Sequence, residues 1–209
     1  MTRAALMQTD TPHKRAYFLF GWTLANLVGG FIAGFLENNG LQFAATLMLT
    51  GAIVGILQWL VLRLAMRQVR WWGLASALGW VGGSQVMIFG SPLYRPVVDF
   101  LWSTFGLWEV FWLNLVTGPT PVLGMAIAQV WILSRNTQFS GRFLGSWIFV
   151  SAVAGVAQGG VSAAVCAAYC PILSASLVGL VNGLGWAAYG IVTGLVLLRQ
   201  LDGGDRSLS

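Results

Sequence analysis

Charged residues are scarce in this 209-residue sequence, and this scarcity decides the class of protein. They make up 8% of the chain and hydrophobic residues 57%, against about 25% and roughly 45–50% in ordinary soluble domains. So few charges cannot cover the surface of a soluble domain of this size. The apolar runs are continuous and lack the alternation of barrel strands, which favours membrane-spanning α-helices.

Side chains that carry catalysis or bind metals are equally scarce. His13 is the only histidine and precedes the first apolar run, which excludes bis-histidine haem, a histidine-rich metal site and a Ser-His-Asp triad. No acidic residue lies deep in an apolar run, which argues against proton coupling. We therefore expect no enzyme activity and no haem or metal site.

Only two cysteines are present, Cys166 and Cys170. A disulfide between them is chemically permitted in an oxidising compartment. Two thiols one turn apart on a helix, however, rarely meet disulfide geometry. We predict free thiols.

The apolar runs predict an all-α polytopic bundle of six transmembrane helices, flanked by cytoplasmic segments at 1–15 and 199–209. The predicted spans are 16–36, 41–63, 71–90, 110–134, 144–166 and 172–198. With six spans, ten basic residues fall on one side of the membrane and only Arg95 on the other. The positive-inside rule then places both termini in the cytoplasm. Membrane lipids, and not nucleic acid, are the partners that this charge pattern predicts.

Two local patterns suggest three helix hairpins. The even spans end in LQWLVLR (57–63), AQVWILSR (128–135) and TGLVLLR (193–199), and the odd spans share LANLVGG (24–30), LASALGW (74–80) and FVSAVAG (149–155). A triplication and a common small-residue composition both explain these similarities.

Glycine and proline predict how the helices pack. Glycines four residues apart recur in five of the six spans, for example Gly79 and Gly83, and predict close helix contacts. Pro119 and Pro121 remove two backbone donors and predict a break in the fourth span, either a packing kink satisfied by Thr117 or Thr120 or part of a binding site.

Amides and hydroxyls are the polar groups within the spans. They fit either interhelical hydrogen bonds or a polar seam around a neutral ligand or a pigment magnesium. The candidate ligand-binding residues are Asn26, Trp80, Asn114, Thr117, Thr120, Asn182 and Trp186.

Tryptophans gather near the predicted span ends. An inner interfacial belt is predicted from Trp59, Trp71, Trp72, Trp131 and Trp147. Residues 97–108 predict a short amphipathic helix on the outer surface, which would serve as a membrane anchor, a docking surface or a lid. The candidate contact residues there are Trp102, Trp108 and Trp112.

The run QWLVLR (58–63), then a short basic loop and WWGLASALGW (71–80), resembles a group of small multi-pass membrane proteins of cyanobacteria and related bacteria. The similarity is clearest over residues 51–83. It implies a bacterial inner or photosynthetic membrane and carries no activity and no site residues.

These features together favour a non-catalytic integral subunit of a larger membrane complex. Its expected partners are other membrane-protein subunits, and its candidate ligands are lipid, carotenoid or a chlorophyll-type pigment. The alternative is a small-molecule binding or transport protein that resembles the membrane substrate-binding subunits of vitamin importers.

Overall fold

A computed structural model describes residues 12–66, 68–135 and 139–203, and every regular element in these ranges is helical. The all-α prediction is therefore confirmed. The helices are α1 (Pro12–Leu36), α2 (Gln42–Ala44), α3 (Thr50–Ala65), α4 (Trp72–Phe89), α5 (Ser91–Phe105), α6 (Glu109–Thr117), α7 (Pro119–Leu133), α8 (Gly141–Tyr169) and α9 (Ala175–Gly203). Wider helical turns flank α2, η1 at Glu37–Leu41 and η2 at Ala45–Leu49.

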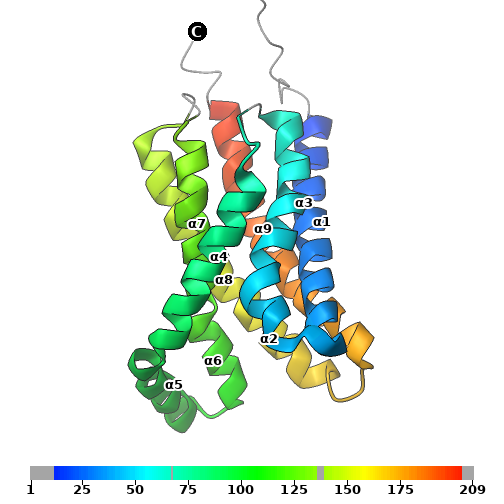
Figure 1. Cartoon of the computed structure of the whole chain (residues 1–209), viewed down its shortest axis with the longest axis vertical. Coiled ribbons are helices and arrows are strands. Elements are labelled where there is room, and N and C mark those ends of the chain that lie inside the picture. The colour runs from blue at the N-terminus through cyan, green and yellow to red at the C-terminus, as the bar shows by residue number, and fades with distance from the viewer. Residues whose placement is uncertain (1–11, 67, 136–138, 204–209) are drawn as a thin grey trace, which may run out of the picture.

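In the described part of the chain, four segments are long and apolar enough to cross a membrane. They are His13–Ala65, Glu109–Leu133, Gly141–Tyr169 and Ala175–Leu201. The first is not straight, because Asn39 and Gly40 leave the helical backbone and Gly40 has a φ of 115°. The chain reverses there, and α3 returns alongside α1 (Figure 1).

Six helices pack in a closed ring that follows the order of the chain. Each of α1, α3, α4, α7 and α8 packs against the next, through to α9, and α9 packs against α1. The short α6 precedes α7 and packs against α8. In contrast, α5 lies beside α6 at one end of the molecule (Figure 1).

Glycines bring neighbouring helices of the ring into backbone contact. A Cβ added at Gly79 of α4 would lie 2.4 Å from the carbonyl oxygen of Gly124 in α7, and one at Gly124 would lie 2.2 Å from that of Gly79. Likewise, a Cβ at Gly34 of α1 would lie 3.1 Å from the Cα of Gly179 in α9. Since only glycine permits such approaches, the predicted small-residue packing is confirmed.

The predicted break in the fourth apolar run is a mild one. The boundary between α6 and α7 falls directly before Pro119, but Gly118 keeps helical dihedrals (φ −50°, ψ −40°) and its N–H donates to the carbonyl of Asn114 at 2.9 Å. The hydroxyl of Thr117 donates to the carbonyl of Leu113 at 2.7 Å. The chain therefore stays helical here and does not unwind around a cavity.

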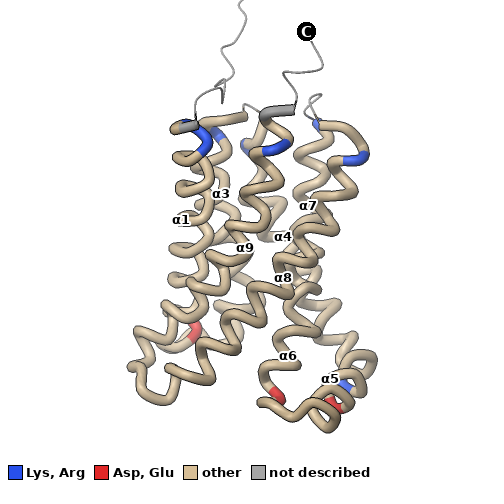
Figure 2. The backbone as a smooth tube through the Cα atoms, turned by 180° about the vertical axis from the view of Figure 1, so that it is seen from behind, with Lys and Arg blue, Asp and Glu red and all other residues tan. Residues whose placement is uncertain are grey.

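Charge divides the two ends of the molecule. Figure 2 shows Lys and Arg gathered where α1 begins and α9 ends, which we call the basic end. The acidic residues of η1, α5 and α6 lie at the opposite end, together with the one basic residue of α5 (Figure 2). We call this second end the α5 end.

The prediction of free thiols is wrong. Cys166 and Cys170 form a disulfide, with their Cα atoms 4.7 Å apart, which lies within the usual range for such bonds. Because α8 ends at Tyr169, directly before Cys170, the second thiol is not held inside a continuing helix as the sequence argument assumed.

Candidate functional site: a central network and a cavity at the α5 end

Three tryptophans meet at the centre of the ring. Trp22 of α1, Trp72 of α4 and Trp147 of α8 are fully buried. The indole group of Trp72 lies edge-on to the indole groups of Trp22 and Trp147, at centroid distances of 6.3 and 6.1 Å. Trp72 and Trp147 therefore do not belong to the predicted interfacial belt, whereas Trp71 and Trp131 are 43% and 52% exposed.

Each of these indole nitrogens donates to the helix that precedes its own in the ring. Trp72 donates to the side-chain oxygen of Gln58 in α3 at 3.0 Å, and Trp147 to that of Gln129 in α7 at 3.3 Å. Trp22 donates to the hydroxyl of Thr193 in α9 at 3.0 Å. One tryptophan–acceptor pair thus recurs three times around the ring.

The two glutamines extend these pairs into one network. The amide nitrogen of Gln58 donates to Asn26 at 2.8 Å, and that of Gln129 donates to Ser76 at 2.8 Å and to the oxygen of Gln58 at 3.4 Å. Every member is buried. We call the set the central network: Trp22, Asn26, Gln58, Trp72, Ser76, Gln129, Trp147 and Thr193.

The contact between α9 and α8 departs from the pattern of the two glutamines. Thr193 donates its own proton to the carbonyl of Tyr189 at 2.8 Å and has no amide with which to reach Ser151. The hydroxyls of Ser151 and Tyr189 are buried and lie near one another without a well-formed hydrogen bond. The network is therefore less complete on this side of the ring.

Three of the predicted ligand-binding residues belong to the packed interior. Asn26 accepts from Gln58 and donates to the carbonyl of Trp22 at 2.8 Å, so its amide is already satisfied. Trp80 donates to the carbonyl of Thr46 at 2.7 Å, and its ring lies 5.5 Å from that of Trp186. Packing and hydrogen bonding within the chain thus account for all three.

Asn114 and Asn182 come together in a cavity of about 220 Å³ at the α5 end. Their amide nitrogens donate to the carbonyls of Val110 and Gly30, at 2.8 and 3.0 Å. The lining also includes Glu37, Trp108, Cys166 and Ser162, whose hydroxyl is buried without a partner in the described residues. We call this the amide cavity; with Asn38, which also lines it, the lining contains a carboxylate, three amides and a hydroxyl that suit a small polar molecule.

Thr117 lines a different cavity of about 200 Å³, formed also by Met87, Ser91, Tyr94, Arg95 and Leu113. Thr120 lines neither cavity, and its backbone carbonyl instead packs at Gly83. The seven predicted residues are thus divided between two cavities and the packed interior and form no single site.

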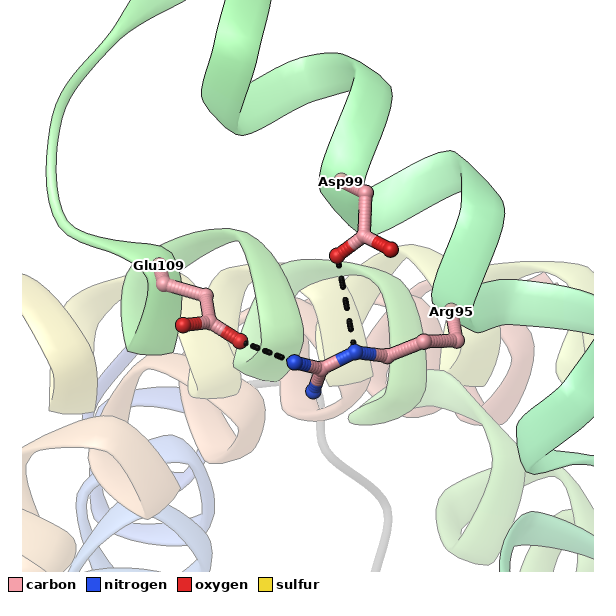
Figure 3. Close-up of polar contacts among 3 residues, drawn as sticks. All are labelled: Arg95, Asp99 and Glu109. Atoms are coloured by element: carbon pink, nitrogen blue, oxygen red, sulfur yellow. Dashed lines mark ion pairs between the residues drawn. The ribbon is translucent and has the colours of Figure 1, made fainter.

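The α5 helix is tied to its neighbours by polar contacts. Figure 3 shows Arg95 between two carboxylates, with 3.4 Å to Asp99 and 2.7 Å to Glu109 of α6. Tyr94 donates to the carbonyl of Met87 in α4, and burial raises the pKa of its hydroxyl. Since the three charged side chains are partly exposed, they orient α5 more than they stabilise it.

The amphipathic helix predicted over 97–108 is observed, displaced toward the N-terminus, as α5. Gly106, with a φ of 66°, ends it, in a positive-φ conformation that glycine adopts without a steric penalty. Of the three candidate contact residues, Trp102 and Trp108 are 47% and 43% exposed. Trp112 instead donates to the carbonyl of Gly106 at 2.8 Å and so fastens the α5–α6 turn.

Comparison with known protein families, with curated proteins and with solved structures finds no match to this chain. The class of protein therefore follows from the molecule itself. It is an all-helical protein in which, among the described residues, four segments have the length and composition to cross a membrane.

Proposed function

We propose that the protein crosses a bacterial inner or photosynthetic membrane six times, with both termini in the cytoplasm. The ring of six helices and the gathering of Lys and Arg at one end support this topology. The disulfide at the α5 end gives independent support, because disulfides persist in oxidising compartments outside the cytoplasm.

The six helices are proposed to be three hairpin repeats: α1 with α3, α4 with α7, and α8 with α9. The recurring tryptophan–acceptor pairs support this arrangement, since they join equivalent helices around the ring. The packed leucines Leu62, Leu133 and Leu197 add to it: each lies four residues after the acceptor on its helix and is buried. Repeats related by an axis along the membrane normal have this geometry.

We propose further that the protein is a non-catalytic integral subunit of a larger membrane assembly. The central network carries this proposal. It joins all six ring helices through buried hydrogen bonds, and alternating access would have to break several of them at once. A bundle locked in this way is suited to a scaffold that holds other subunits or lipids in place.

Purification from the native membrane tests this function. The tagged full-length protein would be extracted in mild detergent, and the co-purifying proteins and pigments identified by mass spectrometry and absorption spectroscopy. A stoichiometric membrane-protein partner is expected. A solitary protein whose stability does not depend on other subunits would refute the proposal.

A solute-binding function is the second candidate, and the amide cavity favours it. The buried hydroxyl of Ser162 lacks a partner there, and buried polar groups usually have one. A small polar solute bound at this site should raise the melting temperature of the native protein but not that of Asn182→Leu. A solute screen without any such hit would count against this candidate.

A further inference from the structure

A groove between α4 and α7 opens on the outside of the ring near the basic end. It has a volume of about 460 Å³, within the range of ligand pockets. Its lining is apolar and aromatic: Trp71, Leu74, Ala75, Leu78, Ala128 and Trp131. Leu74 and Leu78 are 51% and 65% exposed, so the chain itself leaves much of this lining uncovered.

The groove owes its shape to the way the two helices approach. They are in backbone contact at Gly79 and Gly124. The residues that line the groove precede Gly79 or follow Gly124 in the sequence, on the side of the basic end. There the small side chains of Ala75 and Ala128 lie between larger leucines and tryptophans. An apolar lining of this kind suits an alkyl chain.

Two arginines mark the basic end of the groove. The guanidinium of Arg70 lies 4.9 Å from the ring centroid of Trp71, and that of Arg135 lies 4.0 Å from the ring centroid of Trp131. Both tryptophans line the groove. Neither arginine forms an ion pair with a carboxylate within residues 12–66, 68–135 and 139–203, so both guanidinium groups can bind an external anion.

We propose that this groove binds one anionic phospholipid, with an acyl chain along Leu74 and Leu78 and the phosphate between Arg70 and Arg135. Guanidinium groups match phosphate oxygens in charge and in planar donor geometry. Basic clusters beside apolar helix surfaces attract anionic lipids at the cytoplasmic leaflet. Placing the lipid in that leaflet rests on the proposed topology.

The test uses full-length, delipidated protein in detergent and native mass spectrometry. Phosphatidylglycerol and phosphatidylcholine with identical acyl chains would be titrated, and phosphatidylglycerol should bind roughly tenfold more tightly, as a charge-assisted contact predicts. Inorganic phosphate at millimolar concentration should not displace it, because the acyl chain contributes to binding. Equal binding of the two lipids, or displacement by phosphate, would overturn the proposal.

Variants separate the headgroup from the chain. Arg70→Gln with Arg135→Gln should abolish the preference for phosphatidylglycerol. Arg63→Gln should not, although Arg63 stacks on Trp59 at 5.1 Å in the same manner, because Trp59 does not line the groove. An equal loss of preference in both variants would show that no localised headgroup site exists.

A second pair of variants fills the groove without changing charge. Ala128→Leu should weaken the binding of both lipids, whereas Ala164→Leu, at an exposed position on α8, should leave it unchanged. Thermal unfolding of each variant checks that the fold is intact.

If these results hold and no partner subunit co-purifies, the lipid site stands and the subunit function fails. If partner subunits co-purify but the protein shows no preference for phosphatidylglycerol, the subunit function stands and the lipid site fails.

Discussion

The indole nitrogen of Trp72 donates a 3.0 Å hydrogen bond to the side-chain oxygen of Gln58, and both side chains are fully buried. Gln58 also donates to Asn26 and accepts from Gln129. One amide thus connects α1, α3, α4 and α7. The stability of the bundle should depend on it more than on any exposed polar group.

Gln58→Leu tests this dependence. The substitution leaves Trp72 and Asn26 without their partner, so the free energy of unfolding should fall by about 2 kcal/mol. Thermal unfolding in detergent, followed by circular dichroism, measures the loss. Gln85→Leu serves as the control because Gln85 is exposed on α4. Equal melting temperatures of the two variants would contradict a structural role for the network.

The bond between Trp22 and Thr193 closes the ring between its first and last helices. A double-mutant cycle of Trp22→Phe and Thr193→Val should give a coupling energy of about 0.6 to 1.7 kcal/mol, the range of interhelical hydrogen bonds in membranes. Trp71→Phe paired with Thr193→Val should give none, since Trp71 lies on the outer surface. Zero coupling in the first cycle would mean that this bond does not hold α1 to α9.

Gly79→Ala should force α4 away from α7, because the new Cβ would lie 2.4 Å from the carbonyl oxygen of Gly124. We expect a loss of about 1–3 kcal/mol, as for other overpacked contacts. Gly82 on the same helix has open space at its Cβ position, so Gly82→Ala should be neutral or slightly stabilising. Urea or thermal unfolding distinguishes the two, and a reversed order would refute the close contact of α4 with α7.

The disulfide provides a test of topology. In intact spheroplasts, Cys166 and Cys170 should react with a membrane-impermeant maleimide only after treatment with an impermeant reductant. Ser134→Cys in a Cys166→Ser/Cys170→Ser background should react only after permeabilisation, since Ser134 follows α7 at the basic end. Labelling of Ser134→Cys in intact cells would place the arginines outside and overturn the proposed topology.

Several helices were predictable to within a few residues, whereas the predicted span 41–63 is divided into several helical segments and 110–134 into α6 and α7. The predicted span 71–90 is α4 at Trp72–Phe89, and 144–166 lies inside α8 at Gly141–Tyr169. The length of an apolar run depends on composition alone, so it is read directly from the sequence. The helix α5 begins at Ser91, six residues before the predicted helix, with Pro92 in its first turn, where a proline is tolerated because that N–H has no partner within the helix.

The direction of each side chain was not predictable in the same way. Trp71 and Trp72 are adjacent in the sequence, yet the first is 43% exposed and the second is fully buried. The position of a residue along a helix determines its depth along the helix axis. The neighbouring helices decide which residues face the interior of the bundle. A polar residue four positions after each central tryptophan, as in Trp22 and Asn26 or Trp72 and Ser76, was the available signal for the central network.

By itself the sequence determined the helical class, the positions of the apolar helices and the gathering of basic residues at one end, because all three depend on composition along one dimension. Only the tertiary structure decided that Asn26 is satisfied by Gln58 while Asn114 and Asn182 share a cavity. An asparagine side chain either bonds to a neighbouring side chain or lines a cavity, according to which groups the adjacent helices place within hydrogen-bond distance. That placement depends on packing in three dimensions.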